Sequence, residues 1–478
     1  MVNVHLGSDP SNERIKCNLG GGLSRIREEI TVEPVLVLFM LSSSISALAI
    51  ENLNLEKSCY VNLNLSTSIC DAMQQRNRSG FSEMDEITVQ KVVAAAGIWK
   101  SAAYCVLITV LLPLFGSWSD RNKTVKILIL LPILGEIVAN IGLILCTYFY
   151  YEWPMEVNSI FEILPTAITG GIPLALAGVF TYMSSNTTNE NRTFRLGIIH
   201  TLVVICKTIG GTLSGVLYQL VGLYGVFSVT LALYVLGAVY TQFMLPSCTS
   251  TKDQKRSLNK CELIVDVVNV KKTVGSFSFI ATEGSGIQRR QLYAILFLDF
   301  IIVGPFVGQA SVMYLYTRLR FNWDAMDYSV FGAYSAVCHL IGNVGSIVIF
   351  SKLLKADDSI LGGVSSMSRI LGGIGYALSP TVIWFYACTL LDVVNGTAFI
   401  VSRSMATKLV TESNMGKVNS LFGVIEALSA LACTPAYSAF YRVTIEIFPG
   451  AFNILGVIVT LPAILIYIWL YIRRDVRA

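Results

Sequence analysis

The stretch GSWSDRNKTVKILILLPILGEIVANIGLIL, residues 116–145, contains the pattern that decides the fold. A short charged segment is followed by an apolar run from Val125 to Leu145, and this run does not alternate polar with apolar residues. A transmembrane β-strand would alternate over about ten residues, whereas a helix needs about 20 largely apolar residues to cross a bilayer. The stretch therefore predicts a membrane-spanning helix that follows a charged turn.

The whole chain has the composition of a membrane protein. Its 478 residues are 54% hydrophobic and 14% charged, with a mean hydropathy of +0.62. So few polar side chains cannot cover a soluble globule of this size. Apolar runs of spanning length recur about twelve times, so we expect an all-α, twelve-span integral membrane protein. The predicted spans are 31–51, 97–116, 125–148, 159–183, 195–219, 225–245, 291–316, 328–350, 359–378, 381–402, 418–440 and 450–472.

The positions of lysine and arginine predict the orientation of these spans. Most of the 35 Lys and Arg residues lie in segments that face the cytosol if the N-terminus does. This bias is the positive-inside pattern of membrane proteins. We therefore expect a cytosolic N-terminal tail, 1–30, and a cytosolic C-terminal tail, 473–478. The basic N-terminal segment is unlike a cleavable signal peptide, so the first span is expected to be retained.

The first predicted outer loop, 52–96, has features of a glycosylated, oxidising compartment. It contains glycosylation sequons at Asn64 and Asn77, and it also contains Cys59 and Cys70. Sequons are used on the outer or luminal side, where disulfides also persist. We expect glycans on both asparagines and a disulfide between the two cysteines, since no other predicted outer segment offers a thiol. The alternative is two free thiols.

A polar segment, 246–290, separates six predicted spans from six others. It is rich in lysine and arginine, and we expect a flexible cytosolic tether, with a folded regulatory element as the alternative. Six-helix bundles at 31–245 and 291–472 on either side of a linker resemble the major facilitator superfamily. That resemblance implies two bundles that rock about a site near the middle of the membrane.

The charged turn that begins at Gly116 resembles a second feature of the same superfamily. The facilitator motif is G-x-x-x-D-(R/K)-x-G-(R/K)-(R/K), and Gly116, Asp120 and Arg121 match its first positions. The resemblance implies a gating role, in which the Asp120 carboxylate accepts bonds from a helix end or an arginine of the other bundle. Residues 123–125 depart from the motif's glycine and basic pair. The alternative is a solvated turn whose charges follow the positive-inside pattern.

A narrower resemblance comes from four stretches of the chain. Residues 412–456, ESNMGKVNSLFGVIEALSALACTPAYSAFYRVTIEIFPGAFNILG, are the most specific, and NRTFRLGIIH at 191–200, SRSMATKLV at 402–410 and VEPVLVLFM at 32–40 accompany them. Together they resemble solute carrier family 46. This is the family of the proton-coupled folate transporter, and insects have multiple paralogues of it. The resemblance extends from the first predicted span to the last.

The resemblance carries over to single residues unevenly. Arg403 matches an arginine that handles substrate and proton in the folate transporter. His200 stands where the folate branch has a glutamate, and Gly171 stands where it has an aspartate. The branch's proton-sensing histidine aligns near Pro305. These three departures argue against folate as the substrate and leave the implied transporter fold untouched.

Charged residues inside the predicted spans are the candidates for function. A charge that faces lipid near the bilayer centre costs at least about 2.5–3.5 kcal/mol, so we expect these side chains to face the protein interior or a wet cavity. Buried structural ion pairs are the alternative for each of them. That alternative is favoured for Glu136 and Arg369, since spans 3 and 9 are outer helices in the resembled fold. The full set is Lys100, Glu136, Lys207, Asp299, Arg369, Asp392 and Glu426.

From this set we predict the residues that bind substrate or proton. Burial favours the neutral form of a carboxyl group, so Asp299, Asp392 and Glu426 are the candidates for a coupling proton. Lys207 and Arg403 are the candidates for an anionic group of the substrate. An imidazole titrates near neutral pH, and His200 is therefore a further candidate.

These observations predict a secondary transporter that moves a small organic, anionic solute by alternating access with proton coupling. A drug-type exporter is the alternative within transport, and a non-transporting receptor or scaffold is the alternative outside it. No phosphate-binding loop, metal-ligand spacing or nucleophile motif occurs, so we expect no enzyme, no cofactor, no metal and no nucleic-acid partner. Either the plasma membrane or an endolysosomal membrane fits the glycosylated loop, and nothing predicts the oligomeric state.

Overall fold

The protein is described here by a computed structural model. It covers residues 32–122, 125–186, 189–245, 286–346, 356–410 and 415–473, with the isolated residues 349 and 354. The predicted N-terminal tail, 1–30, lies outside the described residues, as do most of the linker 246–290 and nearly all of the tail 473–478. The described part is helical and contains no strand.

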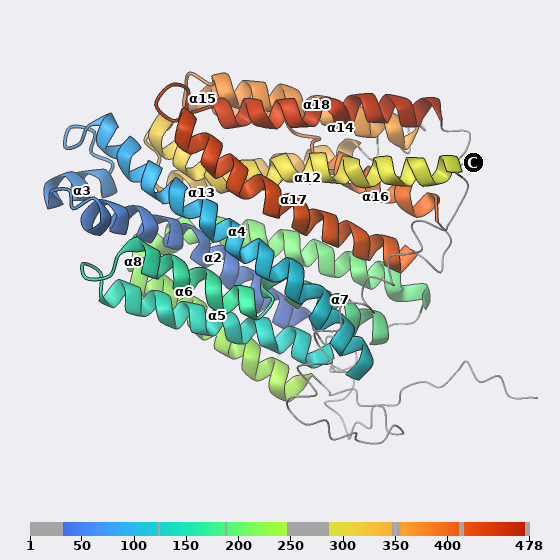
Figure 1. The fold of residues 1–478 in the computed structure, drawn as a ribbon, viewed down its shortest axis with the longest axis horizontal. Coiled ribbons are helices and arrows are strands. Elements are labelled where there is room, and N and C mark those ends of the chain that lie inside the picture. The colour runs from blue at the N-terminus through green and yellow to red at the C-terminus, as the bar shows by residue number, and fades with distance from the viewer. Residues whose placement is uncertain are drawn as a thin grey trace, which may run out of the picture.

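The helices divide into two halves, which Figure 1 shows in blue to green and in yellow to red. The first half contains α2 (Glu33–Lys57), the π-helical turn η1 (Ser58–Asn62), α3 (Thr67–Gln74), α4 (Glu83–Asn122), α5 (Val125–Tyr148), α6 (Met155–Ile168), α7 (Gly171–Asn186) and α8 (Asn189–Met244). The second half contains α12 (Gly286–Phe321), α13 (Ala325–Ser346), α14 (Asp358–Leu378), α15 (Val382–Leu391), α16 (Thr397–Lys408), α17 (Met415–Thr444) and α18 (Ala451–Ile472).

The lengths and compositions of these helices bear on the predicted number of spans. Within the described residues, eight helices are long and apolar enough to cross a membrane. One of them, Leu202–Met244, covers most of two predicted spans, 195–219 and 225–245. The predicted spans 328–350, 359–378 and 381–402 form α13, α14 and the pair α15 and α16, which are less apolar or shorter. The number twelve therefore stays a prediction.

Glycines interrupt two of the long helices. Gly170 and Gly171, with φ of +85° and +50°, separate α6 from α7 in the middle of predicted span 4. Gly222, with φ of +65°, bends α8 between predicted spans 5 and 6. L-residues with a side chain avoid this left-handed region, so glycine is the residue that permits these breaks at little cost.

Helices extend from both sides into the predicted outer loop, 52–96. α2 continues to Lys57 and α4 begins at Glu83, so residues 63–82 connect them around the short α3. The added turns are polar, and hydropathy therefore missed them. Their polar side chains are nevertheless buried: Asn52, Asn54, Glu56, Lys57, Glu86 and Gln90 are all less than 9% exposed.

Lys57 illustrates how these added turns are stabilised. Its side chain is fully buried, and its Nζ donates hydrogen bonds to the carbonyl oxygens of Phe149, Tyr150 and Trp153, at 3.3, 3.1 and 2.9 Å. These carbonyls lie at the C-terminal end of α5, where a cation also interacts favourably with the helix dipole. The lysine thus fastens α2 to the turn between α5 and α6.

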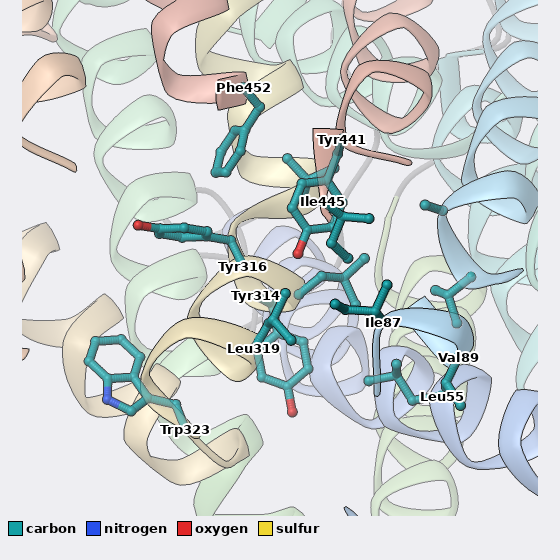
Figure 2. Close-up of a cluster of buried hydrophobic side chains, with 14 of the residues drawn as sticks. Leu55, Ile87, Val89, Tyr314, Tyr316, Leu319, Trp323, Tyr441, Ile445 and Phe452 are labelled. Atoms are coloured by element: carbon teal, nitrogen blue, oxygen red, sulfur yellow. The ribbon is translucent and has the colours of Figure 1, made fainter. Parts of the chain in front are cut away.

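The two halves meet at one end of the molecule. Each half has apolar clusters of its own, whereas a further cluster draws on both. Figure 2 shows this seam cluster: Leu55, Ile87 and Val89 of the first half lie beside Tyr314, Tyr316, Tyr441 and Phe452 of the second. It lies at the end of the bundle that carries α3, which we call the α3 end. According to the predicted orientation, this end faces the outside.

Candidate functional site

An ion pair occupies the break between α15 and α16. Asp392 follows the last residue of α15, is 2% exposed, and accepts hydrogen bonds from Arg369 Nη1 at 3.2 Å and Asn395 Nδ2 at 2.7 Å. His339 Nε2 on α13 lies 3.7 Å from the same carboxylate. Gly372 permits this approach of α14, because a Cβ there would lie 2.5 Å from the Asp392 Cβ.

This pair belongs to a polar chain through the second half. Arg369 Nη2 donates to Gln309 Oε1 on α12, and Gln309 Nε2 donates to Asn453 Oδ1 on α18 at 2.7 Å. Buried charges are tolerated when they are paired and hydrogen-bonded in this way. The sequence favoured a structural role for Arg369 and a solute or proton role for Asp392. The geometry places both in one buried pair.

A second charged group lies between α16 and α17. Arg403 Nη2 pairs with Glu426 Oε1, and both side chains are about one-third exposed, at 34% and 31%. The guanidinium also lies over two rings, 4.6 Å from the Phe399 centroid and 5.3 Å from that of Phe422. Such stacking holds a planar guanidinium in place while part of it stays accessible. This arginine is therefore positioned to meet an anionic group.

Asp299 lies close to this pair. It is located on α12, is 0% exposed, and interacts electrostatically with Glu426 and Arg403. Neither of its carboxylate oxygens has a hydrogen-bond partner among the described residues. An ionised carboxylate without donors is costly to bury, whereas a carboxyl group that holds a proton is not. Asp299 is thus a buried carboxyl group, without a donor among the described residues, beside the pair of Arg403 and Glu426.

Lys207 stands apart from both groups. It is exposed on α8, and within the described part of the chain it makes no ion pair. Gly211, one turn further along, faces open space, and Gly215, another turn on, contacts Ala325 and Ser329 of α13. Residues four apart lie on the same side of a helix. Lys207 therefore lies on α8 two turns before the point where α8 and α13 touch.

The first half contains a third charged group, which the sequence analysis recognised in part. Lys100 on α4 pairs with Glu162 on α6, and Glu51 on α2 interacts electrostatically with both. Lys100 had been singled out, but the two glutamates had been missed. Glu162 lies within the predicted span 159–183, so the same search for charges in apolar runs would have found it. Glu51 was hidden because the predicted span ended there.

Several predicted site residues lie where the side chains are not described. Gly116, Asp120 and Arg121 belong to the last turns of α4, which stays helical to Asn122. His200 lies in α8. The side chains of these residues are outside the described part, so the gating motif and His200 stay predictions. The structure separates the other predicted residues into Arg403 with Glu426 and Asp299, Asp392 with Arg369, and Lys207.

The α3 end carries the predicted disulfide and sequons. Cys59 in η1 is joined to Cys70 in α3, with their Cα atoms 5.9 Å apart. Asn64 and Asn77 are both exposed on the segment between α2 and α4. The Asn77 Oδ1 accepts hydrogen bonds from the backbone N and Oγ of Ser79, at 3.3 and 2.7 Å. Both asparagines are therefore sterically open to a glycan.

Substitution of the sequon asparagines tests this arrangement. Asn64→Gln and Asn77→Gln are each expected to increase electrophoretic mobility by one glycan, and the double variant by two, because each removes one acceptor amide. Mobility is measured before and after digestion of the wild-type protein with an N-glycosidase, which marks the fully deglycosylated position. A wild-type band that does not move on digestion would contradict the prediction.

Comparisons with known proteins agree with this architecture. The family model "Major Facilitator Superfamily" matches residues 36–434. The "Probable peptidoglycan muropeptide transporter SLC46" of Drosophila melanogaster is 21% identical over 431 residues, which cover 88% of this chain and 82% of that protein. The "Lysosomal proton-coupled steroid conjugate and bile acid symporter SLC46A3" of Gallus gallus is 21% identical and covers 93% and 94%. The "Proton-coupled folate transporter" of Rattus norvegicus is 23% identical and covers 72% and 74%.

Solved structures share the fold at lower identity. The human organic anion transporter MFSD10 (TETRAN) superposes with a TM-score of 0.61 at 13% identity, covering 92% of this chain and 99% of that one. The inward-open xylose transporter XylE from E. coli has a TM-score of 0.58 at 12% identity, covering 91% and 95%. The matched relatives are transporters rather than enzymes. The chain is thus an integral membrane protein that belongs to the Major Facilitator Superfamily and resembles the transporters of solute carrier family 46.

Proposed function

We propose that this protein is a twelve-span secondary transporter that moves a small organic anion by alternating access, coupled to protons. The observation that carries the proposal is the group formed by Arg403, Glu426 and Asp299. It combines a partly accessible guanidinium with two carboxyl groups, one of which is buried without a hydrogen-bond donor among the described residues.

The charge balance of this group favours an anion that travels with a proton. With Asp299 protonated, Arg403 and Glu426 neutralise each other. A solute anion that binds Arg403 in place of Glu426 leaves the Glu426 carboxylate without its cation in a medium of low dielectric constant. The proton on Asp299 keeps a second carboxylate from adding to this negative charge, so anion and proton bind together more favourably than either alone. Lys207, which is exposed on α8, is the candidate for a further cation that contacts the solute.

The names of the relatives support an acidic solute. Muropeptides, steroid conjugates, bile acids and folates all bear acid groups, and these are the solutes in the names of the three relatives described above. Their chemistries differ widely in size and ring structure. We therefore propose the shared feature, an anionic group on an organic framework, and no single compound.

The number of spans is part of the proposal. Two arguments support twelve: the bend at Gly222 divides α8 into two segments of spanning length, and α13, α14 and the pair α15 and α16 coincide with three further predicted spans. Cytosolic tails and a cytosolic linker follow from the positive-inside pattern. Cysteine scanning of 1–30, 246–290 and 473–478 with an impermeant reagent would locate each of these segments.

Uptake by proteoliposomes tests the function directly. A panel of labelled folates, steroid conjugates, bile acids, muropeptides and cyclic dinucleotides is offered at an external pH of about 5.5 and of about 7.5, which bracket histidine and perturbed carboxyl titration. We expect one class to accumulate, and faster at the acidic pH. In Asp299→Asn the pH dependence should disappear, whereas the control Asp358→Asn, on the ion pair with Lys408, should retain it.

The outcomes separate the alternatives. Accumulation that is equal at both pH values would overturn proton coupling and leave anion transport standing. A lack of uptake across the panel, by protein shown to be folded, would contradict import of these solutes. Export is then tested with preloaded vesicles, and a scaffold that does not transport is indicated if both directions are inactive.

A further inference from the structure

The seam at the α3 end contains charges as well as apolar side chains. Arg318 on α12 is buried, with its side chain 6% exposed. Its Nη1 donates to Asn52 Oδ1 at 3.2 Å, its Nη2 donates to the Met73 carbonyl at 3.1 Å, and its Nε lies 3.4 Å from Glu86 Oε1. Arg318 belongs to the second half, whereas all three of these partners belong to the first.

A second arginine crosses the same seam in the opposite direction. Arg76, in the segment between α3 and α4, pairs with Glu86 through Nη1 at 2.8 Å and Nη2 at 3.2 Å. Its Nη2 also donates to the Arg318 carbonyl at 2.6 Å, and its own carbonyl accepts from Asn322 Nδ2 at 2.9 Å. The segment between α3 and α4 is therefore bonded to the end of α12 through both the side chain and the backbone of Arg76.

The buried charges of Arg76, Arg318 and Glu86 affect one another electrostatically. Burial and the neighbouring Arg318 lower the pKa of Arg76, and the Glu86 carboxylate acts against both effects. Glu56 lies within electrostatic range of Arg318. It accepts hydrogen bonds from the hydroxyls of Tyr150 and Tyr218, both at 2.6 Å, and from Gln74 at 3.0 Å. Two buried arginines thus lie beside two buried carboxyl groups.

The disulfide fastens this segment to the first half. Cys59 lies in η1, directly after α2. Cys70 lies in α3, three residues before Met73. Cys59, Cys70 and Met73 belong to the seam cluster, and all three are nearly fully buried. A segment anchored at one end on α2 and bonded at the other to α12 spans the boundary between the two halves.

We propose that residues 59–76 form a strap across the α3 end, and that Arg76, Glu86 and Arg318 form the lock that keeps the halves closed there. These are positioning residues for alternating access. The inference relies on the proposed movement of the two halves, but it is independent of which solute is moved. Separation of the halves at this end would break the contacts of Arg318 with Asn52, Met73 and Glu86 at the same time. The lock therefore favours the state that is closed at this end.

A cysteine within the seam reports opening without any solute. Val93 on α4 is 6% exposed and lies seven residues from Glu86, on the same face. Gly97, on that face too, approaches Ser438 of α17. In a Val93→Cys background, the labelling rate by a membrane-impermeant maleimide, applied on the glycosylated side, measures opening of the α3 end. Protein without this substitution gives the signal from native cysteines, which is subtracted.

Loss of the lock is expected to speed labelling. Arg318→Met should label at least about tenfold faster than the Val93→Cys parent, because removal of one partner of a buried charge network disfavours the closed seam. Arg320→Met is the matched control: Arg320 lies on the same helix two residues away and is exposed, so its rate should equal the parent's. Equal rates in the Arg318 and Arg320 variants would overturn the proposal.

Two further variants separate the lock from the strap. Glu86→Arg alone should speed labelling, and combination with Arg318→Glu should restore slow labelling, since the exchange preserves the net charge of the three residues. Cys59→Ser with Cys70→Ser should speed labelling if the strap needs its anchor. A double exchange that labels as fast as Glu86→Arg overturns the lock, and an unchanged rate without the disulfide overturns the strap.

A milder variant protects the test against misfolding. If Arg318→Met fails to reach the membrane, Asn322→Ala replaces it, since it removes the single bond from this amide to the Arg76 carbonyl. It should raise the labelling rate by a smaller factor, and an unchanged rate would count against the lock. Because no solute is added, a failed uptake panel would leave this result unaffected, and a failed labelling test would leave the uptake result unaffected.

Discussion

Replacement of Arg369 by methionine is expected to lower the free energy of unfolding by about 3–5 kcal/mol, the cost of removing one partner from a buried ion pair. Asp392 is 2% exposed and would lose its 3.2 Å contact with the guanidinium. The amide of Asn395 would remain as a donor, but an amide does not neutralise a carboxylate. Gln309 would also lose its donor from Arg369.

The measurement is the thermal unfolding of purified protein in detergent, followed by tryptophan fluorescence. Arg320→Met is the control, because it removes an exposed arginine by the same substitution. Addition of Asp392→Asn to Arg369→Met should recover much of the lost stability, since the carboxylate that needs the cation is then absent. A melting temperature of Arg369→Met equal to that of the control would show that the pair does not stabilise the fold.

Replacement of Arg403 by alanine is expected to lower uptake of the solute identified by the panel by about two orders of magnitude. Loss of one partner of a hydrogen-bonded charge pair costs about 2–5 kcal/mol, and each 1.4 kcal/mol is about tenfold. The variant removes the proposed contact for the solute anion. It also leaves Glu426 unpaired beside Asp299, so that negative charge replaces positive charge at the site.

Lys408→Ala is the matched control for Arg403. Lys408 lies on the same helix, is 58% exposed and pairs with Asp358, so its loss should leave uptake within a small factor of the wild type. Arg403→Lys should recover part of the activity, because it restores the charge but not the planar, stacked guanidinium. Uptake is normalised to the amount of folded protein in the vesicles. Wild-type uptake by Arg403→Ala would remove this residue from the solute path.

The charged residues of these two pairs were found from the sequence, but the sequence did not show which of them pair. Arg369 pairs with Asp392 and Arg403 pairs with Glu426 across an equal separation of 23 residues. The separation along the sequence is the same, yet one pair is buried at a helix break and the other is partly exposed between two helices. Whether a charge in an apolar run faces a partner, a cavity or lipid depends on the rotation of its helix, which hydropathy does not report.

The seam at the α3 end was missed for a related reason. Asn52, Glu56, Glu86 and Gln90 are polar, so the hydropathy pattern assigned them to a loop. In the structure they extend α2 and α4, and all four are buried; Asn52 and Gln90 bond to Tyr314 and Tyr441 of the second half. Burial of a polar residue depends on a partner that arrives from a distant part of the chain, and Arg318 lies more than 200 residues away from Asn52 and Met73.

The sequence by itself determined that the chain is helical, belongs in a membrane and divides into two halves. These properties follow from composition and run length, because the cost of placing a residue in a bilayer is largely a local property that can be read along the chain. The tertiary structure decided which charges pair, where helices break, and at which end the halves close. These depend on contacts between helices that are far apart in sequence, whose rotation and approach are set by packing of the whole bundle.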